Sequence, residues 1–299
     1  MKRAYLQLHT AVFLAGFTAI LGKLIHLHEG WLVAYRLLFT LLILGIWLYW
    51  QGSSFSLKPR LVLRIFFIGS IVAAHWLCFY ASIKYANASI ALVCLAANGI
   101  FTALIEPVMV KRRWVPAEIL LGLLSLAGIY IIFDFHPHYK MGIIFGIVSA
   151  LGSSIFPVLN KQLVNLYPPR IITFYEMMGA LLTIVLFLPI YLNFFPADQW
   201  QPTFNDFAWL LVLSLLCTVI SFDLQLRSLR RLSAFTSNLT YNLEPVYGIF
   251  LAFLLLDEAK HFKSGFYIGI LLVAAAVGLQ VWRVGRERSK RLAELRASA

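Results

Sequence analysis

The residue types best suited to chemistry gather in one apolar stretch near the end of the chain, residues 234–258, which is long enough to cross a bilayer. Five residues in its first half and middle recur at intervals of three and four: Ser237, Thr240, Tyr241, Glu244 and Gly248. On a continuous helix they share one face, with Asn242 on an adjoining row. An acid inside an apolar span is costly, so Glu244 predicts a functional site and is a candidate proton carrier. The alternative is that Glu244 only locks its helix to a neighbour.

A second candidate is His75, which lies about halfway along the apolar stretch 62–84, beside Trp76. His75, Phe79 and Ser82 follow helical spacing and therefore share a face. An imidazole in the membrane interior can bind a proton or a carboxylate. The alternative is a hydrogen bond to a serine or an asparagine of a neighbouring helix.

Arg36 and Asn98 complete the set of candidate binding residues. Arg36 lies a few residues inside the stretch 31–50, where it either binds an anionic substrate or reaches to the outer membrane surface. Asn98 lies within the stretch 88–110 and serves either the same site or helix packing. Glu176 is expected at the opposite end of the membrane from Arg36, too far away for an ion pair.

Other charged residues and histidines are better explained by structure. Glu106 lies near a basic loop, where an ion pair with Lys111 or Arg112 is expected. Asp223 and Arg227 are one turn apart, acid first, which favours an ion pair. Two lysines near helix ends are expected to reach the membrane surface, and two outer-loop histidines are too few for a metal site. They are Lys23, Lys161, His136 and His138.

The elements that position these residues follow from composition. The 299 residues are 61% hydrophobic and only 13% charged, which excludes a soluble domain and indicates an all-α integral membrane protein. The net charge of +12 does not indicate nucleic-acid binding, because the basic residues lie in short loops and in the C-terminal tail. Ten spans are predicted: 5–26, 31–50, 62–84, 88–110, 117–134, 140–162, 170–192, 207–228, 234–256 and 264–283.

The distribution of lysine and arginine predicts the orientation of these spans. With the N-terminus inside, nineteen basic residues fall in cytoplasmic segments and four in outer ones, so both termini are predicted to be cytoplasmic. We expect a multi-pass protein of the bacterial inner membrane. Residues 284–299 form a basic tail on the inner leaflet.

Weak internal similarity divides the spans into two sets of five, residues 5–134 and 140–283. Because five is an odd number, two copies of the unit must have opposite orientations in the membrane. NASIAL at 87–92 resembles SAFTSN at 233–238, an offset of 146 positions. The same offset makes Asn98 the counterpart of Glu244 and predicts that both lie at similar depth on opposite walls of a central space.

These segments resemble the EamA family of the drug/metabolite transporter superfamily. The resemblance is carried by GFTAILGKLI at 16–25, AYRLL at 34–38, and the longer stretches 74–97, 103–113 and 240–258. It implies ten transmembrane helices as two inverted five-helix repeats, and a secondary transporter that exports small metabolites or amino acids. It also implies no obligatory metal or nucleotide cofactor. No family-wide catalytic residues are transferred, so the site prediction rests on the residues themselves.

Three classes of function compete. A carrier, working by alternating access and with protons as a candidate coupling ion, fits the inverted halves and the polar groups in the membrane interior. An integral-membrane enzyme needs histidines, carboxylates or a metal gathered at one interface, whereas the seven histidines scatter over both sides. A channel needs a continuous charged or carbonyl-lined pore. The expected partners are a small-molecule substrate and the lipid bilayer, with the chain a monomer or a homodimer.

Overall fold

The computed structural model describes residues 2–52, 57–111, 113–135, 139–197, 199–232, 237, 240–241, 243–256 and 264–297. Within these residues all regular secondary structure is helical, and seven helices are long and apolar enough to cross a membrane. Three shorter apolar helices accompany them: Pro116–Gly128, Glu244–Leu255 and Tyr267–Ala276. Each of the ten predicted spans overlaps one of these helices. The prediction of an all-helical membrane protein is confirmed.

The described helices fall into two sets along the chain, and several of them begin at a proline. The first half contains α1 (Lys2–Leu24), α2 (Glu29–Trp50), α3 (Pro59–Tyr85), α4 (Ala88–Leu95), α5 (Asn98–Val110) and α6 (Pro116–Phe135). The second contains α7 (Lys140–Lys161), α8 (Pro169–Phe194), α9 (Phe204–Ser214), the π-helix η2 (Leu215–Ile220), α10 (Ser221–Leu229), α12 (Glu244–Leu255) and α13 (Ser264–Ala297). Three of these helices, α3, α6 and α8, begin at a proline, whose missing N–H is unused in the first turn.

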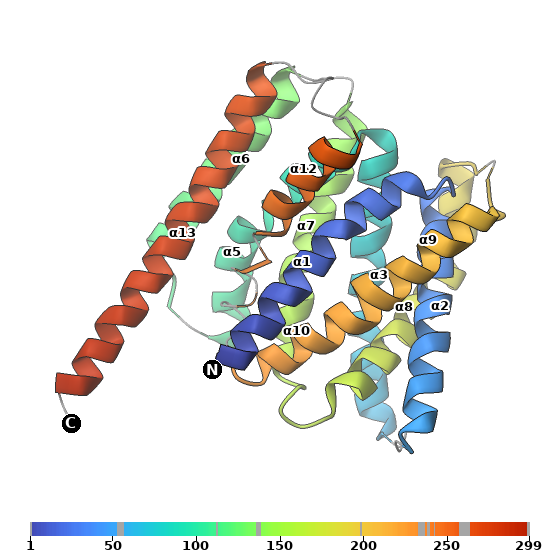
Figure 1. Cartoon of the computed structure of the whole chain (residues 1–299), viewed down its shortest axis with the longest axis horizontal. Helices are drawn as coiled ribbons and strands as arrows, with labels where there is room; N and C mark the ends of the chain where they lie inside the picture. Colours follow the sequence, from blue (N-terminus) through green and yellow to red (C-terminus); the bar gives the residue numbers. More distant parts are fainter. Residues whose placement is uncertain are drawn as a thin grey trace.

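Helices from the two halves of the chain pack against one another (Figure 1). The third helix, α3, lies against α7 and α8, while α1 lies against α10 and α12. The helices α6 and α13 form a pair at one side of the bundle. Glycines permit the closest contacts: a Cβ added to Gly69 of α3 would lie 2.1 Å from the main-chain oxygen of Glu176 in α8. Close approach of backbones through small residues is typical of helix packing in membranes.

Two of the predicted spans depart from a regular α-helix within their length. In the stretch 88–110, α4 ends at Leu95 and α5 begins at Asn98. The amides of Ala96 and Ala97 bond to the carbonyls three residues earlier, which is the tighter 3₁₀ pattern.

In the stretch 234–256, Leu243 forms a turn and α12 begins at Glu244. Pro245 then lies in the first turn, the position in a helix that a proline tolerates best. The expected single face from Ser237 to Gly248 is therefore divided at Leu243. Asn242 lies outside the described residues.

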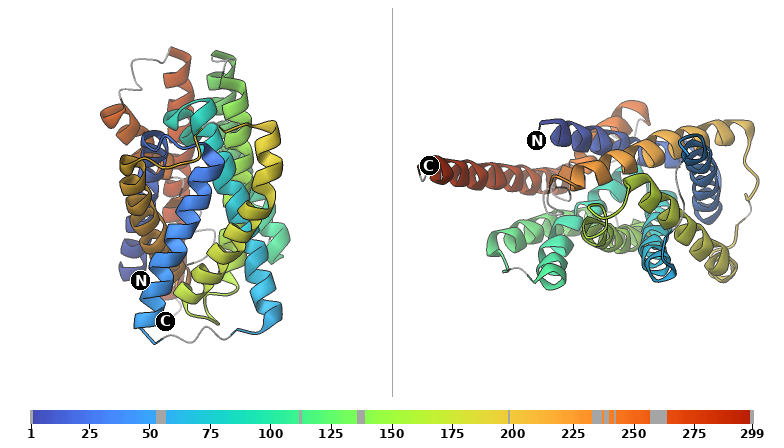
Figure 2. Two further views of the ribbon diagram at one scale, coloured as in Figure 1. Left: turned by 90° about the vertical axis from the view of Figure 1, so that its right-hand side faces the viewer. Right: turned by 90° about the horizontal axis from the view of Figure 1, so that it is seen from below.

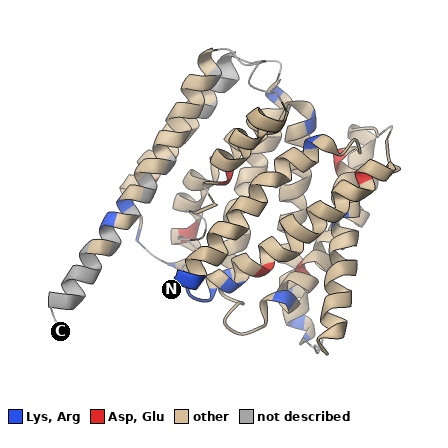
Figure 3. Ribbon diagram, viewed as in Figure 1, with Lys and Arg blue, Asp and Glu red and all other residues tan. Residues whose placement is uncertain are grey.

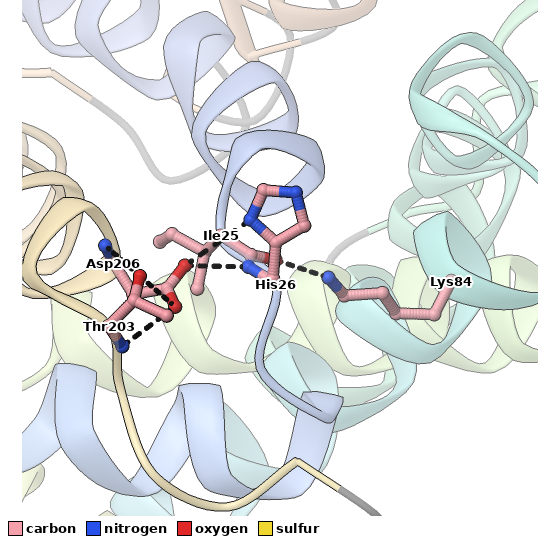
Figure 4. A network of polar contacts seen from close by, with 5 residues as sticks. All are labelled: Ile25, His26, Lys84, Thr203 and Asp206. Carbon is pink, nitrogen blue, oxygen red and sulfur yellow. Dashed lines mark hydrogen bonds and ion pairs between the residues drawn. The ribbon is translucent and has the colours of Figure 1, made fainter.

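The two ends of the bundle differ in their polar contacts. The N-terminus and the far end of α13 lie toward the same end of the molecule (Figure 2), and lysine and arginine gather near this end (Figure 3). At the opposite end, α1, α3 and α9 meet in a polar junction (Figure 4). There the amide of His26 donates to Asp206 Oδ1 at 2.7 Å, and Lys84 Nζ donates to the carbonyl of Ile25. Thr203 caps α9 by accepting from the Asp206 amide, so the junction joins the end of α1, the end of α3 and the start of α9.

Candidate functional site

Seven of the eight predicted site residues line one cavity inside the bundle. They are Arg36, His75, Trp76, Phe79, Asn98, Tyr241 and Glu244. The eighth, Asn242, lies outside the described residues. In this conformation the cavity has a volume of about 60 Å³, room for a few water molecules.

The most deeply buried charged side chain at this cavity is that of Arg36, which is only 1% exposed. Its Nε donates to Thr218 Oγ1 at 2.9 Å and one terminal nitrogen donates to the Tyr80 hydroxyl at 2.8 Å. The guanidinium carbon lies 3.6 Å from the centroid of the Trp76 ring, a cation–π contact. The alternative that Arg36 reaches the membrane surface is therefore wrong. These contacts fix the orientation of the guanidinium plane over the Trp76 ring and direct the group into the bundle.

The π-helix η2 contains Thr218, the hydrogen-bond partner of the Arg36 Nε. A π-helix inserts an extra residue into a helical turn and is frequent at functional sites. Thr218, within η2, donates to the carbonyl of Leu213 at 3.2 Å, and Ser214 donates to the carbonyl of Arg36 itself at 3.1 Å. Thr218 of η2 thus binds the side chain of Arg36, and Ser214, the last residue of α9, binds its backbone.

His75 joins α3 to α7 through Ser149. Nδ1 lies 2.8 Å from the main-chain oxygen of Ser149, and the Ser149 hydroxyl donates to the main-chain oxygen of His75 at 3.0 Å. The predicted alternative of a hydrogen bond to a serine is thus confirmed for Nδ1. Because a carbonyl oxygen can only accept, Nδ1 carries the hydrogen in this contact. In the neutral ring Nε2 is then an acceptor, suited to a cationic group or a proton.

Aromatic rings form the apolar wall of the cavity. The ring of His75 lies between those of Phe79 and Phe156, with centroids 6.3 and 5.9 Å away. Phe156 stacks on Phe222 at 6.0 Å and 12°, and Phe222 meets Trp76 edge to face at 5.8 Å. These rings come from α3, α7 and α10, so the wall belongs to both halves of the chain.

Asn98 and Glu244 line the cavity from the first residues of α5 and α12. The amide oxygen of Asn98 accepts from the Thr102 hydroxyl at 2.8 Å, which leaves the amide nitrogen as a donor. Helix N-termini carry partial positive charge, which favours a negatively charged group nearby. Arg36 and Glu244 line the same cavity, yet no ion pair joins them in the described part of the chain. Each can therefore receive an oppositely charged group of a ligand.

Several lining residues do not stand out in the sequence, namely Thr18, Ser153, Phe156, Cys217, Ser221, Phe222 and Gln225. Ser221 and Gln225 are spaced i, i+4 within the predicted span 207–228. This spacing places both polar residues on one helix face and could have been recognised in the sequence. The remaining residues resemble ordinary packing residues of a membrane helix. Their role depends on how α1, α7 and α10 face each other, which periodicity within one helix does not show.

Two further predictions concern Asp223 and Lys161, which lie outside the central cavity. Asp223 and Arg227 form the expected ion pair at 2.8 Å. The ammonium of Lys161 donates to the carbonyls of Leu229 and Leu232 at the end of α10. Free carbonyls at a helix C-terminus attract such a cation.

The remaining polar residues lie away from the cavity. Glu176 is fully buried and accepts from the Asn160 amide at 3.0 Å. Glu106 is buried and lies outside the set of cavity-lining residues. Of its two proposed partners, Lys111 is exposed at the end of α5, and Arg112 lies outside the described residues, as do His136 and His138.

Comparisons with known proteins find a shared fold and, separately, relatives named as transporters. A solved crystal structure superposes with a TM-score of 0.68 over 96% of this chain and 99% of the other, at 18% identity, which shows the shared fold. An "uncharacterized transporter" of Clostridium kluyveri is 25% identical over 207 residues, 64% of this chain. Another from Archaeoglobus fulgidus is 29% identical over 148 residues, 49% of this chain. Human solute carrier family 35 member F3 is 26% identical over 133 residues, 43% of this chain.

The matched regions span less than two thirds of these relatives: 63%, 50% and 31% of their respective lengths. The sequence profile of the EamA-like transporter family matches this chain twice, over residues 2–134 and again over residues 140–281. Together the two matches cover nearly every described helix. The chain therefore belongs to the EamA-like transporter family.

Proposed function

We propose that this membrane transporter is a secondary carrier that binds one small organic solute in the cavity between its two halves and moves it by alternating access. The observation that carries the proposal is that Arg36 and Glu244 line the same cavity although no ion pair joins these two residues. Unpaired charged groups inside a membrane protein are costly and are retained where a ligand or ion completes them.

Two inverted five-helix repeats, residues 5–134 and 140–283, are the architecture we propose for this carrier. The double match of the family profile supports it, as do the helix breaks before Asn98 and Glu244. In carriers built from inverted repeats, interrupted helices meet near the membrane midplane and their free ends contact the substrate. We place both termini in the cytoplasm of a bacterial cell, as the distribution of basic residues predicts.

The substrate class follows from the chemistry of the cavity. The guanidinium of Arg36 suits a carboxylate, and Glu244 with Nε2 of His75 suits an ammonium group. The rings of Trp76 and Phe156 provide an apolar wall for the rest of the molecule. An amino acid or a similar zwitterionic metabolite carries these groups. Because the cavity measures about 60 Å³, such a solute enters only when the helices separate, as alternating access requires.

Export coupled to protons is the transport cycle we favour. A proton on Glu244 and an ammonium group of the substrate would compete for the same carboxylate. Binding of one would release the other, which links export of the solute to entry of a proton. The position of Glu244 at the cavity supports this role, because the membrane interior disfavours an unpaired carboxylate.

A thermal-shift screen of the purified protein against a metabolite library tests the binding site. A ligand that binds only the folded state at about 100 times its Kd adds about 2.7 kcal/mol of stability. We expect a zwitterionic metabolite to stabilise the wild-type protein and the Glu176→Gln variant, whose altered acid lies outside the cavity. The same metabolite should not stabilise Arg36→Gln. Equal stabilisation of all three proteins would place the binding site elsewhere.

A further inference from the structure

A second cavity of about 580 Å³ lies where α2 and α10 end and α8 begins. Its lining residues are Leu48, Gln51, Pro168, Pro169, Arg170, Ile171, Asp223, Arg227 and Arg230. None of them lines the central cavity. Its volume falls within the range of small-molecule sites, about 300–1,000 Å³.

The charges in this cavity are unbalanced. Three arginines face one acid, which gives a formal charge of +2. Asp223 is shared by two of them: its Oδ2 lies 2.8 Å from Arg227 Nε and its Oδ1 lies 3.3 Å from Arg170 Nε. One carboxylate between two guanidinium groups cannot neutralise both, and Arg230 adds a third positive charge.

The arginines are held in place by contacts that leave part of each guanidinium group unused. Arg170 stacks on the Trp47 ring at 3.8 Å and donates to Gln51 Oε1 at 2.9 Å. Arg230 donates through Nε to the carbonyl of Val164 at 2.9 Å and through one terminal nitrogen to that of Tyr167. A guanidinium group has five N–H donors, so donors remain for an oxyanion. Planar arginine forks favour phosphate and carboxylate groups.

We propose that this cavity binds the phosphate group of an anionic phospholipid, whose acyl chains lie along the apolar surfaces of α2 and α8. Leu48 and Ile171 form apolar walls beside the arginines. Contact with these apolar surfaces stabilises an acyl chain but not a free phosphate ion. Basic pockets between membrane helices are known to bind lipid headgroups, and the cytoplasmic leaflet, where we expect this end, is rich in anionic lipid.

Native mass spectrometry of the purified protein, titrated separately with phosphatidylglycerol, phosphatidylcholine and inorganic phosphate, tests this site. The wild-type protein should bind phosphatidylglycerol about tenfold more tightly than phosphatidylcholine. The double variant Arg227→Gln/Arg230→Gln, which brings the cavity to a formal charge of zero, should lose that preference. The control Arg60→Gln/Arg231→Gln removes the same charge from exposed positions outside the cavity and should keep it.

Four outcomes would overturn the proposal. Equal affinity of the wild-type protein for both lipids removes its basis. Equal loss of preference in the control variant assigns the effect to net charge rather than to this cavity. Binding of inorganic phosphate without a preference for phosphatidylglycerol makes the site one for free anions. If the double variant does not fold, Arg230→Gln alone, at an exposed residue, should lower the preference severalfold, and an unchanged preference contradicts the proposal.

Discussion

Asn98 and Glu244 are each the first residue of a helix that follows a break in an apolar segment, and both line the same cavity. They are 146 positions apart, the offset that the match between residues 87–92 and 233–238 predicts for the two halves of the sequence. Two helix N-termini therefore meet at one space, each with a polar side chain at its start. This arrangement gives the proposed carrier hydrogen-bond donors and the carboxyl group of Glu244 at the point where its two halves face each other.

Replacing Arg36 with lysine should weaken ligand binding although the positive charge is kept. Lysine loses the planar contact with Trp76 and cannot donate to Thr218 and Tyr80 while presenting a fork to a carboxylate. We expect the Kd of the stabilising metabolite to rise by about tenfold or more, measured by isothermal titration calorimetry in detergent. An unchanged Kd would show that Arg36 is a packing residue.

Glu244→Gln should uncouple transport from protons. The amide keeps the size of the side chain but binds no proton at physiological pH, so substrate movement should no longer drive proton movement. A pH-sensitive dye inside proteoliposomes reports this coupling. Glu176→Gln is the matched control, because it changes a buried acid that is bonded to Asn160 outside the cavity. Normal proton movement in Glu244→Gln would assign coupling to another group, with His75 the next candidate.

Much of this site could be predicted from the sequence because polar residues are rare in membrane spans. His75, Asn98 and Glu244 each stand out against apolar neighbours, and the repeat offset alone relates Asn98 to Glu244. The cost of burying such groups explains why they come together around a cavity. The composition of the chain also indicates an all-helical membrane protein.

The parts that could not be predicted depend on contacts between helices. The direction of the Arg36 side chain is set by Trp76, Tyr80 and Thr218, residues as many as 182 positions away. The breaks at Ala96 and Leu243 interrupt apolar segments that read as continuous spans. Hydropathy cannot reveal such breaks, because a cavity or protein contact inside the bundle satisfies the backbone there.

Gly69→Ala should destabilise the protein by separating α3 from α8. The added methyl group meets the main-chain oxygen of Glu176 and the amide of Ala180, which cannot move aside as a side chain could. Overpacking of this kind costs about 1–3 kcal/mol, so the Tm in detergent should fall. Gly278→Ala is the control, since a methyl group there meets no described atom within 4 Å. A Tm of Gly69→Ala at or above that of the control would contradict the packing.

Single cysteines test the proposed orientation. Lys140→Cys and Arg60→Cys place exposed thiols at the starts of α7 and α3, in segments predicted to lie outside and inside. A membrane-impermeant maleimide added to whole cells should label position 140, whereas position 60 should react only after permeabilisation. The three native cysteines are replaced first. The reverse labelling pattern would invert the topology.

Counterflow in proteoliposomes tests the central claim most directly. Vesicles containing the wild-type protein and loaded with the stabilising metabolite should take up labelled metabolite from outside, with a saturable initial rate that unlabelled internal metabolite accelerates. Vesicles with Arg36→Gln should lose this exchange, while those with Glu176→Gln should retain it. Flux that rises linearly with concentration and ignores internal metabolite, or exchange that persists undiminished in Arg36→Gln, would contradict a carrier that binds its substrate in this cavity.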